Sequence, residues 1–334
     1  MAVKDSGASL AISELVTEFG DDAGGSDSLS EYYAGGDNVP SGAAGESGDI
    51  PSSGTISMSQ FYGSANRVAI ALQIGQALTA SYNIRSNVGG TYSAGGSDIT
   101  LTVQANVTSG STNQAAIETG EFASGDTVKI INNAQILAKG GSGGSGAVAQ
   151  ATQSNQQISG SGGGAAGHGL NLQFPVTIQN NGGTIKGGGG GGGGGGTGAD
   201  ANSMKGNVQT NASGGGGGGG AAVGGAGSAP QSFGALQRQA SAGQAGQAAA
   251  GGNGGQGGSG GPTGQPASGG TGGNGGAFAA AGQAGDAGAS KNSSGVTFTG
   301  GAGGAGGAAG KAINLNGHQV TYEDGDGNVT GAVS

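Results

Sequence analysis

The sequence predicts a mainly β protein: an irregular N-terminal segment, then a small antiparallel β-sandwich-like domain, then a bundle of polyglycine II helices. Three observations predict this class. Acidic residues are concentrated before residue 65, apolar and polar residues alternate in the middle of the chain, and 68 of the 87 glycines follow residue 139. The predicted boundaries are residues 1–65 for the N-terminal segment, 66–139 for the β domain and 140–334 for the glycine-rich bundle.

The N-terminal segment repeats one short phrase three times, as AISEL, SLSEYY and SMSQFY. Serine is a favoured helix N-cap, so each phrase is expected to open a short turn that presents apolar side chains to a partner. The segment carries ten acidic residues against Lys4 alone, and its apolar surface is too small for it to fold alone. We expect an attachment segment that is ordered by its partner; a frayed tail is the alternative. The candidate docking residues are Leu15, Phe19, Tyr32, Tyr33, Phe61 and Tyr62.

The β domain is predicted from strict alternation in the stretch DITLTVQANV, residues 98–107. Its odd-numbered residues, from Ile99 to Val107, are apolar and the residues between them are polar. This pattern is typical of an antiparallel strand with one buried face. RVAIALQI and TVKIINNAQIL are two further strand candidates, and SNVGGTYSAGG supplies turns.

The glycine-rich part is built from GGX tracts and from an unbroken run of ten glycines, Gly187–Gly196. Collagen is excluded because Thr263 breaks the glycine frame and prolines are few. An extended helix with three residues per turn places every X of a GGX repeat on one edge and leaves two edges bare. Such helices are expected to pair laterally through backbone N–H and C=O groups, with the all-glycine runs inside the bundle.

The free-energy margin for such a bundle is thin. Ordering a residue costs about 1–2 kcal/mol, and a lateral hydrogen bond returns about 0.5–1.5 kcal/mol. The strand-like phrases NLQFPVTIQNNGGTI and KAINLNGHQVTYEDG are expected to anchor the flanks of the bundle. Disorder is what composition alone suggests, and an ordered bundle is the prediction that we favour over it.

The sequence offers no catalytic or metal-binding constellation, so no enzyme activity, cofactor or metal is predicted. There is no cysteine, and His168 and His318 lie far apart in the chain. The P-loop-like stretch AGGAAGKA lacks a required glycine and the Ser or Thr, and DGDGN near the C-terminus is better explained as a turn. Positive and negative charges balance after residue 65, which argues against nucleic acid, and no stretch is apolar enough for membrane insertion.

Several phrases resemble those of glycine-rich tail proteins of tailed bacteriophages. IPSSGTISMSQFYGS, residues 50–64, is similar to a phrase common near the N-termini of phage structural proteins. ASGDTVKIINNAQILAKGGSGGSG and FPVTIQNNGGTIKGGGGGGGGGG are similar to two phrases of glycine-rich tail proteins. The C-terminal half is similar in kind to the polyglycine II sandwich of T-even-like tail-tip adhesins.

The resemblance implies a tail fibre or tip adhesin on the surface of the virion, made in the host cytoplasm and released by lysis. Its expected partners are other tail or baseplate proteins, through residues 1–65, and a bacterial surface receptor, either protein or glycan. A homotrimer and a single copy both fit the sequence. The receptor-contact candidates are Met204, Lys205, Phe233, Arg238 and Phe278, in phrases between the glycine tracts. For the phenylalanines, the alternative is that each plugs an end of the bundle.

Two other functions are open at this stage. One is a purely structural tail or neck component whose glycine bundle touches no receptor. The other is an ice-binding or surface-coat protein, because a GGX bundle can present a flat face; the irregular inserts between the tracts argue against it.

Overall fold

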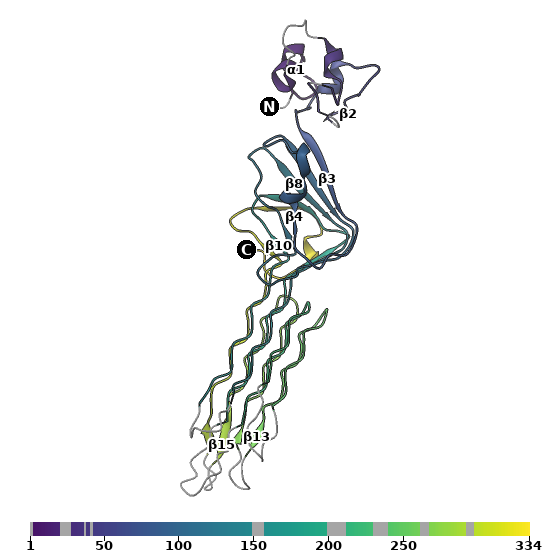
Figure 1. Ribbon diagram of the computed structural model, residues 1–334. Coiled ribbons are helices and arrows are strands. Elements are labelled where there is room, and N and C mark those ends of the chain that lie inside the picture. The colour runs from purple at the N-terminus through teal and green to yellow at the C-terminus, as the bar shows by residue number, and fades with distance from the viewer. Residues whose placement is uncertain are drawn as a thin grey trace.

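The computed structural model describes residues 3–20, 28–36, 38–40, 43–148, 157–198, 212–229, 240–260, 267–291 and 297–334. The molecule is elongated (Figure 1): a small N-terminal unit lies at one end, a β structure in the middle, and long extended segments project from the β structure away from the N-terminal unit. No helix in these ranges has the length and hydropathy of a membrane span.

The N-terminal unit packs short elements around a few aromatic rings. Phe19, Tyr32 and Phe61 contact one another edge to face, with centroids 6.2–6.5 Å apart. The Ser57 N–H donates to Gln60 Oε1 at 2.7 Å, which fixes the turn that delivers Phe61. The elements of this unit are α1 (Ile12–Phe19), η1 (Leu29–Tyr32), β1 (Ala44–Gly45), β2 (Gly48–Asp49) and η2 (Met58–Phe61).

The middle of the molecule is a parallel β-helix with three faces. The first face pairs β3 (Val68–Ile74), β5 (Ser97–Val103), β8 (Thr127–Asn132), β11 (Val176–Gln179) and β18 (Val320–Asp324). The second pairs β6 (Val107–Thr108), β9 (Gln135–Leu137), β12 (Thr184–Lys186) and β19 (Val329–Thr330). The third pairs β4 (Tyr82–Asn83), β7 (Ile117–Glu118), β10 (Leu170–Asn171) and β17 (Ile313–Asn314). The chain visits the faces in turn, so each visit to the first face begins a new coil.

The prediction of an antiparallel β-sandwich is wrong, because every strand pair on these three faces is parallel. Alternation shows that one face of a strand is buried, but it does not show which strand lies beside it or in which direction that strand runs. Four of the five predicted inward residues are nevertheless buried, since Ile99, Leu101, Val103 and Val107 are each at most 1% exposed, whereas Ala105 is only half-buried. The strand-like phrases expected to flank the bundle form coils of the same β-helix.

The core of the β-helix is a stack of equivalent side chains, one from each coil. Leu72, Leu101, Ile130, Ile178 and Tyr322 occupy the same register position on five successive strands of the first face. Such stacking lets each coil bury its apolar face on the next. Two short helices, α2 (Ile84–Asn87) and η3 (Gly89–Thr91), follow β4 on the first coil, and η4 (Asp326–Asn328) lies on the last.

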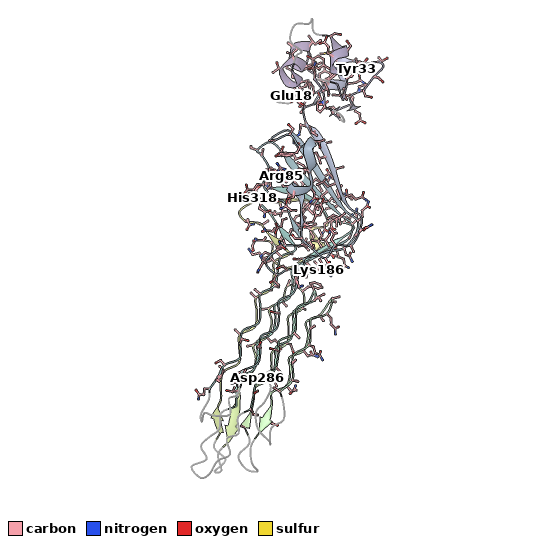
Figure 2. The ribbon with its side chains drawn as sticks, in the orientation of Figure 1. Glu18, Tyr33, Arg85, Lys186, Asp286 and His318 are labelled. Atoms are coloured by element: carbon pink, nitrogen blue, oxygen red, sulfur yellow. The ribbon has the colours of Figure 1, made fainter. Side chains whose placement is uncertain are left out.

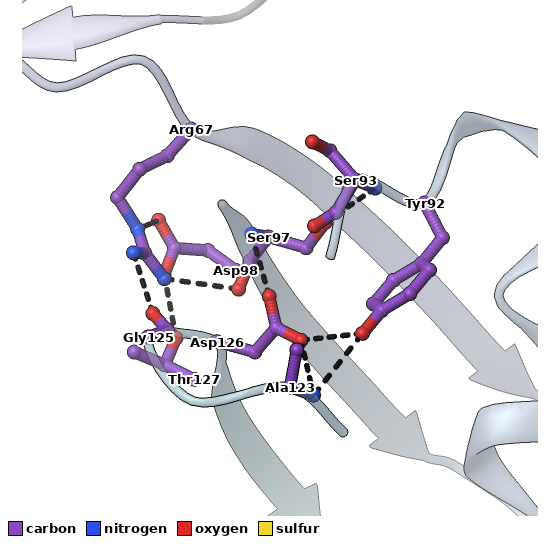
Figure 3. Close-up of polar contacts among 9 residues, drawn as sticks. All are labelled: Arg67, Tyr92, Ser93, Ser97, Asp98, Ala123, Gly125, Asp126 and Thr127. Atoms are coloured by element: carbon purple, nitrogen blue, oxygen red, sulfur yellow. Dashed lines mark hydrogen bonds and ion pairs between the residues drawn. The ribbon is translucent and has the colours of Figure 1, made fainter. Parts of the chain in front are cut away.

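A polar network ties the first three coils together beside the N-terminal unit (Figure 3). Arg67 donates to both carboxylate oxygens of Asp98 at 2.6 and 2.8 Å, and to the carbonyl of Gly125 at 2.7 Å. Asp126 accepts from the Tyr92 hydroxyl at 2.6 Å and from the Ser97 N–H at 3.0 Å. Bidentate Arg–carboxylate bonds of this kind hold a fixed geometry. This network fixes the corner of the β-helix where the chain enters it.

The glycine-rich segments leave the β-helix between its second and third faces, on the third and fourth coils. They run as extended rods, named here in chain order. Rod 1 is residues 140–148, rod 2 is 158–167, rod 3 is 187–198 and rod 4 is 212–220. Rod 5 is residues 224–229, rod 6 is 240–247 and rod 7 is 251–260. Rod 8 is residues 267–276, rod 9 is 280–291 and rod 10 is 297–310. Four rods end in short antiparallel strands: β13 (Ser259–Gly260), β14 (Ala267–Ser268), β15 (Ala289–Lys291) and β16 (Thr297–Thr299).

Candidate functional site

Rod 3 contains the run of ten glycines, and its backbone bonds to its neighbours in strict rotation. The N–H groups of Gly191, Gly192 and Gly193 donate to rods 2, 4 and 9 at 2.7–2.9 Å. The carbonyl groups of the same three residues accept from rods 10, 1 and 8 at 2.7–2.8 Å. The cycle repeats every three residues along the rod. Rod 3 is therefore surrounded by six rods, and its backbone polar groups are satisfied without water.

The close approach of these neighbours explains why the run contains only glycine. A Cβ atom added to Gly191, Gly192 or Gly193 would lie 1.8–2.0 Å from a backbone carbonyl oxygen of an adjacent rod. Movement of a neighbouring side chain could not relieve this overlap, because the obstructing atoms belong to the main chain. All of rod 3 is buried.

Rod 4, which carries the second glycine run, Gly214–Gly220, is enclosed in the same way. The N–H groups of Gly217, Gly218 and Gly219 donate to rods 1, 8 and 6 at 2.8–2.9 Å, and carbonyls of rod 4 accept from rods 3, 5 and 7. The two longest glycine runs of the described chain thus form the two rods that have six neighbours.

The hydrogen bonds define three layers of rods. Rods 2, 1 and 5 form one outer layer, rods 10, 3, 4 and 6 the middle layer, and rods 9, 8 and 7 the other outer layer. Outer rods carry side chains where no neighbour lies. Rod 7, with the repeat GGNGGQGGS, exposes Asn253 and Gln256, and rod 9 exposes Gln283 and Asp286. Figure 2 shows Asp286 on the bundle, well away from the β-helix.

The bundle continues the hydrogen bonding of the β-helix without a break. The Ala138 N–H donates to the Lys186 carbonyl at 3.0 Å between two coils, and the Gly141 N–H donates to Gly189 at 2.9 Å between the rods that follow them. At the same junction, His168 Nδ1 accepts from the Lys311 N–H at 3.1 Å. Burial, helped by the Lys311 charge, lowers the pKa of His168 below its usual value. The β-helix therefore fixes the position and register of the rods.

Phe278 lies in the turn between rods 8 and 9, at the end of the bundle next to the β-helix. Its ring faces Lys186 of β12, whose Nζ lies 5.1 Å from the ring centroid. This position corresponds to the alternative that a phenylalanine closes an end of the bundle. Lys186, His168 and Lys311 form this junction and were not among the predicted residues; the only sequence signal is that each adjoins a glycine tract.

The other four receptor-contact candidates, Met204, Lys205, Phe233 and Arg238, lie outside the described residues. They belong to segments that connect consecutive rods at the end of the bundle distant from the β-helix. Five such connections occur, at residues 149–156, 199–211, 230–239, 261–266 and 292–296. The returning turns next to the β-helix are short, at residues 221–223, 248–250 and 277–279. The described rod ends that these five segments join therefore lie at one end of the bundle.

The docking candidates of the N-terminal unit are mostly inside it. Leu15, Tyr32 and Phe61 are fully buried and Phe19 is 5% exposed, so they form the core of the unit. Tyr33 and Tyr62 are partly exposed, and their hydroxyls donate to the carbonyls of Gly54 and Ala8. The unit packs around an apolar core of its own residues.

A parallel β-helix from which a bundle of hydrogen-bonded glycine-rich rods projects (Figure 1) defines an elongated, fibrous class of protein. Among the described residues, no three His, Asp or Glu side chains gather closely enough to hold a metal ion.

Residues 68–334 match the family model described as "Phage tail fibre adhesin Gp38", so the chain belongs to this family of tail fibre adhesins. The crystal structure of the gp37-gp38 adhesin tip complex of the bacteriophage S16 long tail fiber is similar at 22% sequence identity and a TM-score of 0.44. That similarity covers 82% of this chain and 85% of the other. No curated protein sequence matches the chain.

Proposed function

We propose that this chain is the receptor-binding tip of a tail fibre, in which a polyglycine II bundle holds five connecting segments against the bacterial surface. Membership of the adhesin family supports the general function of a tail adhesin and a position on the virion tail. The three-residue rotation of hydrogen-bond partners along rods 3 and 4 supports the polyglycine II conformation, which has three residues per turn.

The division of labour within the chain follows the proposed domain boundaries. Residues 1–65 attach the protein to another tail protein, the β-helix sets the direction of the rods, and the rods carry the connecting segments outward. The family model begins at residue 68, so the N-terminal unit lies outside the part shared with the family. A separate unit at this position suits a role in attachment to the fibre on which the adhesin is mounted.

A stiff bundle favours binding because the connecting segments are already gathered before the receptor arrives. Each connection joins two neighbouring rods, so its ends are held by lateral hydrogen bonds, which are 2.7–3.5 Å long along rods 3 and 4. Pre-organisation of this kind reduces the conformational entropy that binding would otherwise consume. Met204, Lys205, Phe233 and Arg238 remain the proposed receptor contacts, because amphipathic and aromatic side chains dominate recognition.

The test is an adsorption measurement with the complete chain on the phage particle. Residues 199–211 and 230–239 are replaced together by Gly/Ser segments of the same length, and we expect adsorption to the host to fall at least tenfold. As the matched control, the turn Ala248–Ala250 at the other end of the bundle is replaced by Gly/Ser, which leaves adsorption unchanged. Normal adsorption of particles that carry the doubly replaced chain would favour a purely structural role.

A further inference from the structure

The corner between the first and second faces of the β-helix contains a hollow that none of the functions above uses. Its volume is about 420 Å³, and it spans the second, third and fourth coils. It lies on the body of the β-helix, not on the glycine bundle. Its lining residues are Gln104, Asn106, Asn133, Ala134, Gln135, Asn181, Gly182, Gly183 and Thr184.

Two glycines of the fourth coil let its backbone approach the third coil closely beside the hollow. A Cβ at Gly183 would lie 2.4 Å from the Ala134 carbonyl oxygen, and one at Gly182 would lie 2.7 Å from Asn133 Oδ1. Next to the lining residues, buried Asn132 donates through Nδ2 to Asn180 Oδ1 at 2.7 Å. This side-chain hydrogen bond joins the third and fourth coils beside the hollow.

Uncharged amide side chains dominate the lining. Gln104, Asn106, Asn133, Gln135 and Asn181 are all exposed, and no Asp, Glu, Lys or Arg is among the lining residues. The side-chain amides of Asn133, Gln135 and Asn181 make no hydrogen bond to another described residue. Each amide therefore offers two N–H donors and a carbonyl acceptor to a ligand.

The amides also repeat in register. Asn133 and Asn181 come from successive coils, which are spaced by about 4.8 Å. Gln104 lies on the coil before them, where its side-chain oxygen accepts from Gln73 Nε2. This lining sets three requirements that favour one kind of ligand: no charge, elongation along the coil direction, and donors and acceptors at short intervals. Adjacent hydroxyl groups of a sugar chain meet these three requirements, since each hydroxyl both donates and accepts.

We propose that this amide-lined corner binds a neutral glycan chain. It is a second contact for the cell surface, separate from the connecting segments at the far end of the bundle, and it does not depend on what those segments bind. The hollow is open to solvent and offers mainly hydrogen bonds, so the affinity of one copy is weak, with Kd on the order of 1 mM.

The test uses the full chain and saturation-transfer difference NMR with three defined probes: maltohexaose, a neutral galactose-containing hexasaccharide, and a sialic acid hexamer as the acidic comparison. We expect saturation transfer to at least one neutral probe and none to the acidic one. Asn133→Ala and Gln135→Ala, which each remove one unpaired amide, are expected to weaken neutral binding about tenfold.

Gln256→Ala is the matched control, because Gln256 is an exposed amide on rod 7 and lies outside the hollow; it leaves binding unchanged. Thermal unfolding of all three variants at the wild-type temperature shows that the fold is intact. Failure of the wild type to bind either neutral probe, equal binding by Gln135→Ala, or preference for the acidic probe would each overturn the proposal.

Discussion

At the scale of single residues, the number of neighbouring rods decides where glycine is required. Gly193 of rod 3 has rods on all sides, and a Cβ there would lie 1.9 Å from the Gly304 carbonyl oxygen. Gly162 of rod 2 faces solvent, and the nearest atom to a Cβ there is the Ala305 carbonyl oxygen at 3.5 Å. Two residues of the same type thus carry very different constraints.

Gly193→Ala is expected to destabilise the bundle by about 3 kcal/mol or more, because the added methyl group overlaps main-chain atoms that cannot move independently. Gly162→Ala is the matched control and is expected to change the stability by less than about 0.5 kcal/mol. Chemical denaturation of the two variants beside the wild type measures both values. Similar stabilities for the two variants would show that rod 3 is not enclosed as described.

The half-buried position of His168 predicts that the junction between β-helix and bundle is sensitive to pH. Burial lowers its pKa, so the folded state favours the neutral imidazole, whose Nδ1 accepts from the Lys311 N–H. The stabilisation is present above the unfolded-state pKa of about 6.5 and is lost as the pH falls through the lower folded-state value.

We therefore expect the unfolding temperature of the wild type to fall between pH 7.5 and pH 5. His168→Gln keeps a hydrogen-bond acceptor but does not titrate, so it is expected to reduce this dependence. Differential scanning calorimetry at both pH values is the measurement. An identical pH dependence in the variant would assign the effect to groups other than His168.

At the scale of elements, strands and rods both satisfy their backbone hydrogen bonds through neighbouring segments, but with different periods. A strand of the β-helix alternates inward and outward residues, and its amides bond to two neighbours. A rod rotates through three directions, so a central rod bonds to six neighbours. Both arrangements are joined through continuous hydrogen bonding at residues 138–141 and 186–189, which explains why the bundle leaves the β-helix in fixed register.

The rotation predicts a period of three in amide hydrogen exchange along outer rods. In rod 1, the N–H groups of Gly143 and Gly144 donate to other rods at 2.8 Å, whereas Ser142 and Ser145 have no such bond to a described residue. NMR exchange rates should therefore be fast at the two serines and slow at the glycines between them. Uniformly slow exchange is expected along rod 3, and rapid exchange throughout rod 3 would contradict an ordered bundle.

At the scale of the whole molecule, two separate cores divide the chain. One cluster of buried residues holds the N-terminal unit together, and another, drawn from coils between residues 70 and 313, holds the β-helix. The two clusters share no residue. Each unit therefore has its own apolar burial, the main source of folding free energy.

Removal of residues 1–65 is expected to leave the β-helix and the bundle folded, with an unfolding temperature within a few degrees of the full chain. The same truncation is expected to abolish incorporation into the tail fibre. Circular dichroism and the amount of the truncated protein on purified particles provide the two readouts. Normal incorporation would move the attachment role to the β-helix.

The sequence by itself determined which residues are buried in the strands, where glycine must be concentrated, and the general class of the protein. Alternation in residues 98–107 identified the inward side chains, and the glycine runs identified the rods that have neighbours on all sides. Phrases shared with tail proteins indicated the function that the adhesin family model supports. These properties depend on local periodicity and residue size, which a single sequence displays directly.

Only the tertiary structure decided how these parts are joined. Strand direction, the coil-by-coil stacking and the amide-lined corner depend on residues that lie far apart in the chain, such as Asn106, Gln135 and Asn181. The burial of Leu15, Tyr32 and Phe61 likewise depends on a mutual packing that three separate phrases do not reveal. Periodicity fixes the directions in which a segment forms backbone hydrogen bonds or buries its side chains. The path of the whole chain decides which segment lies beside it.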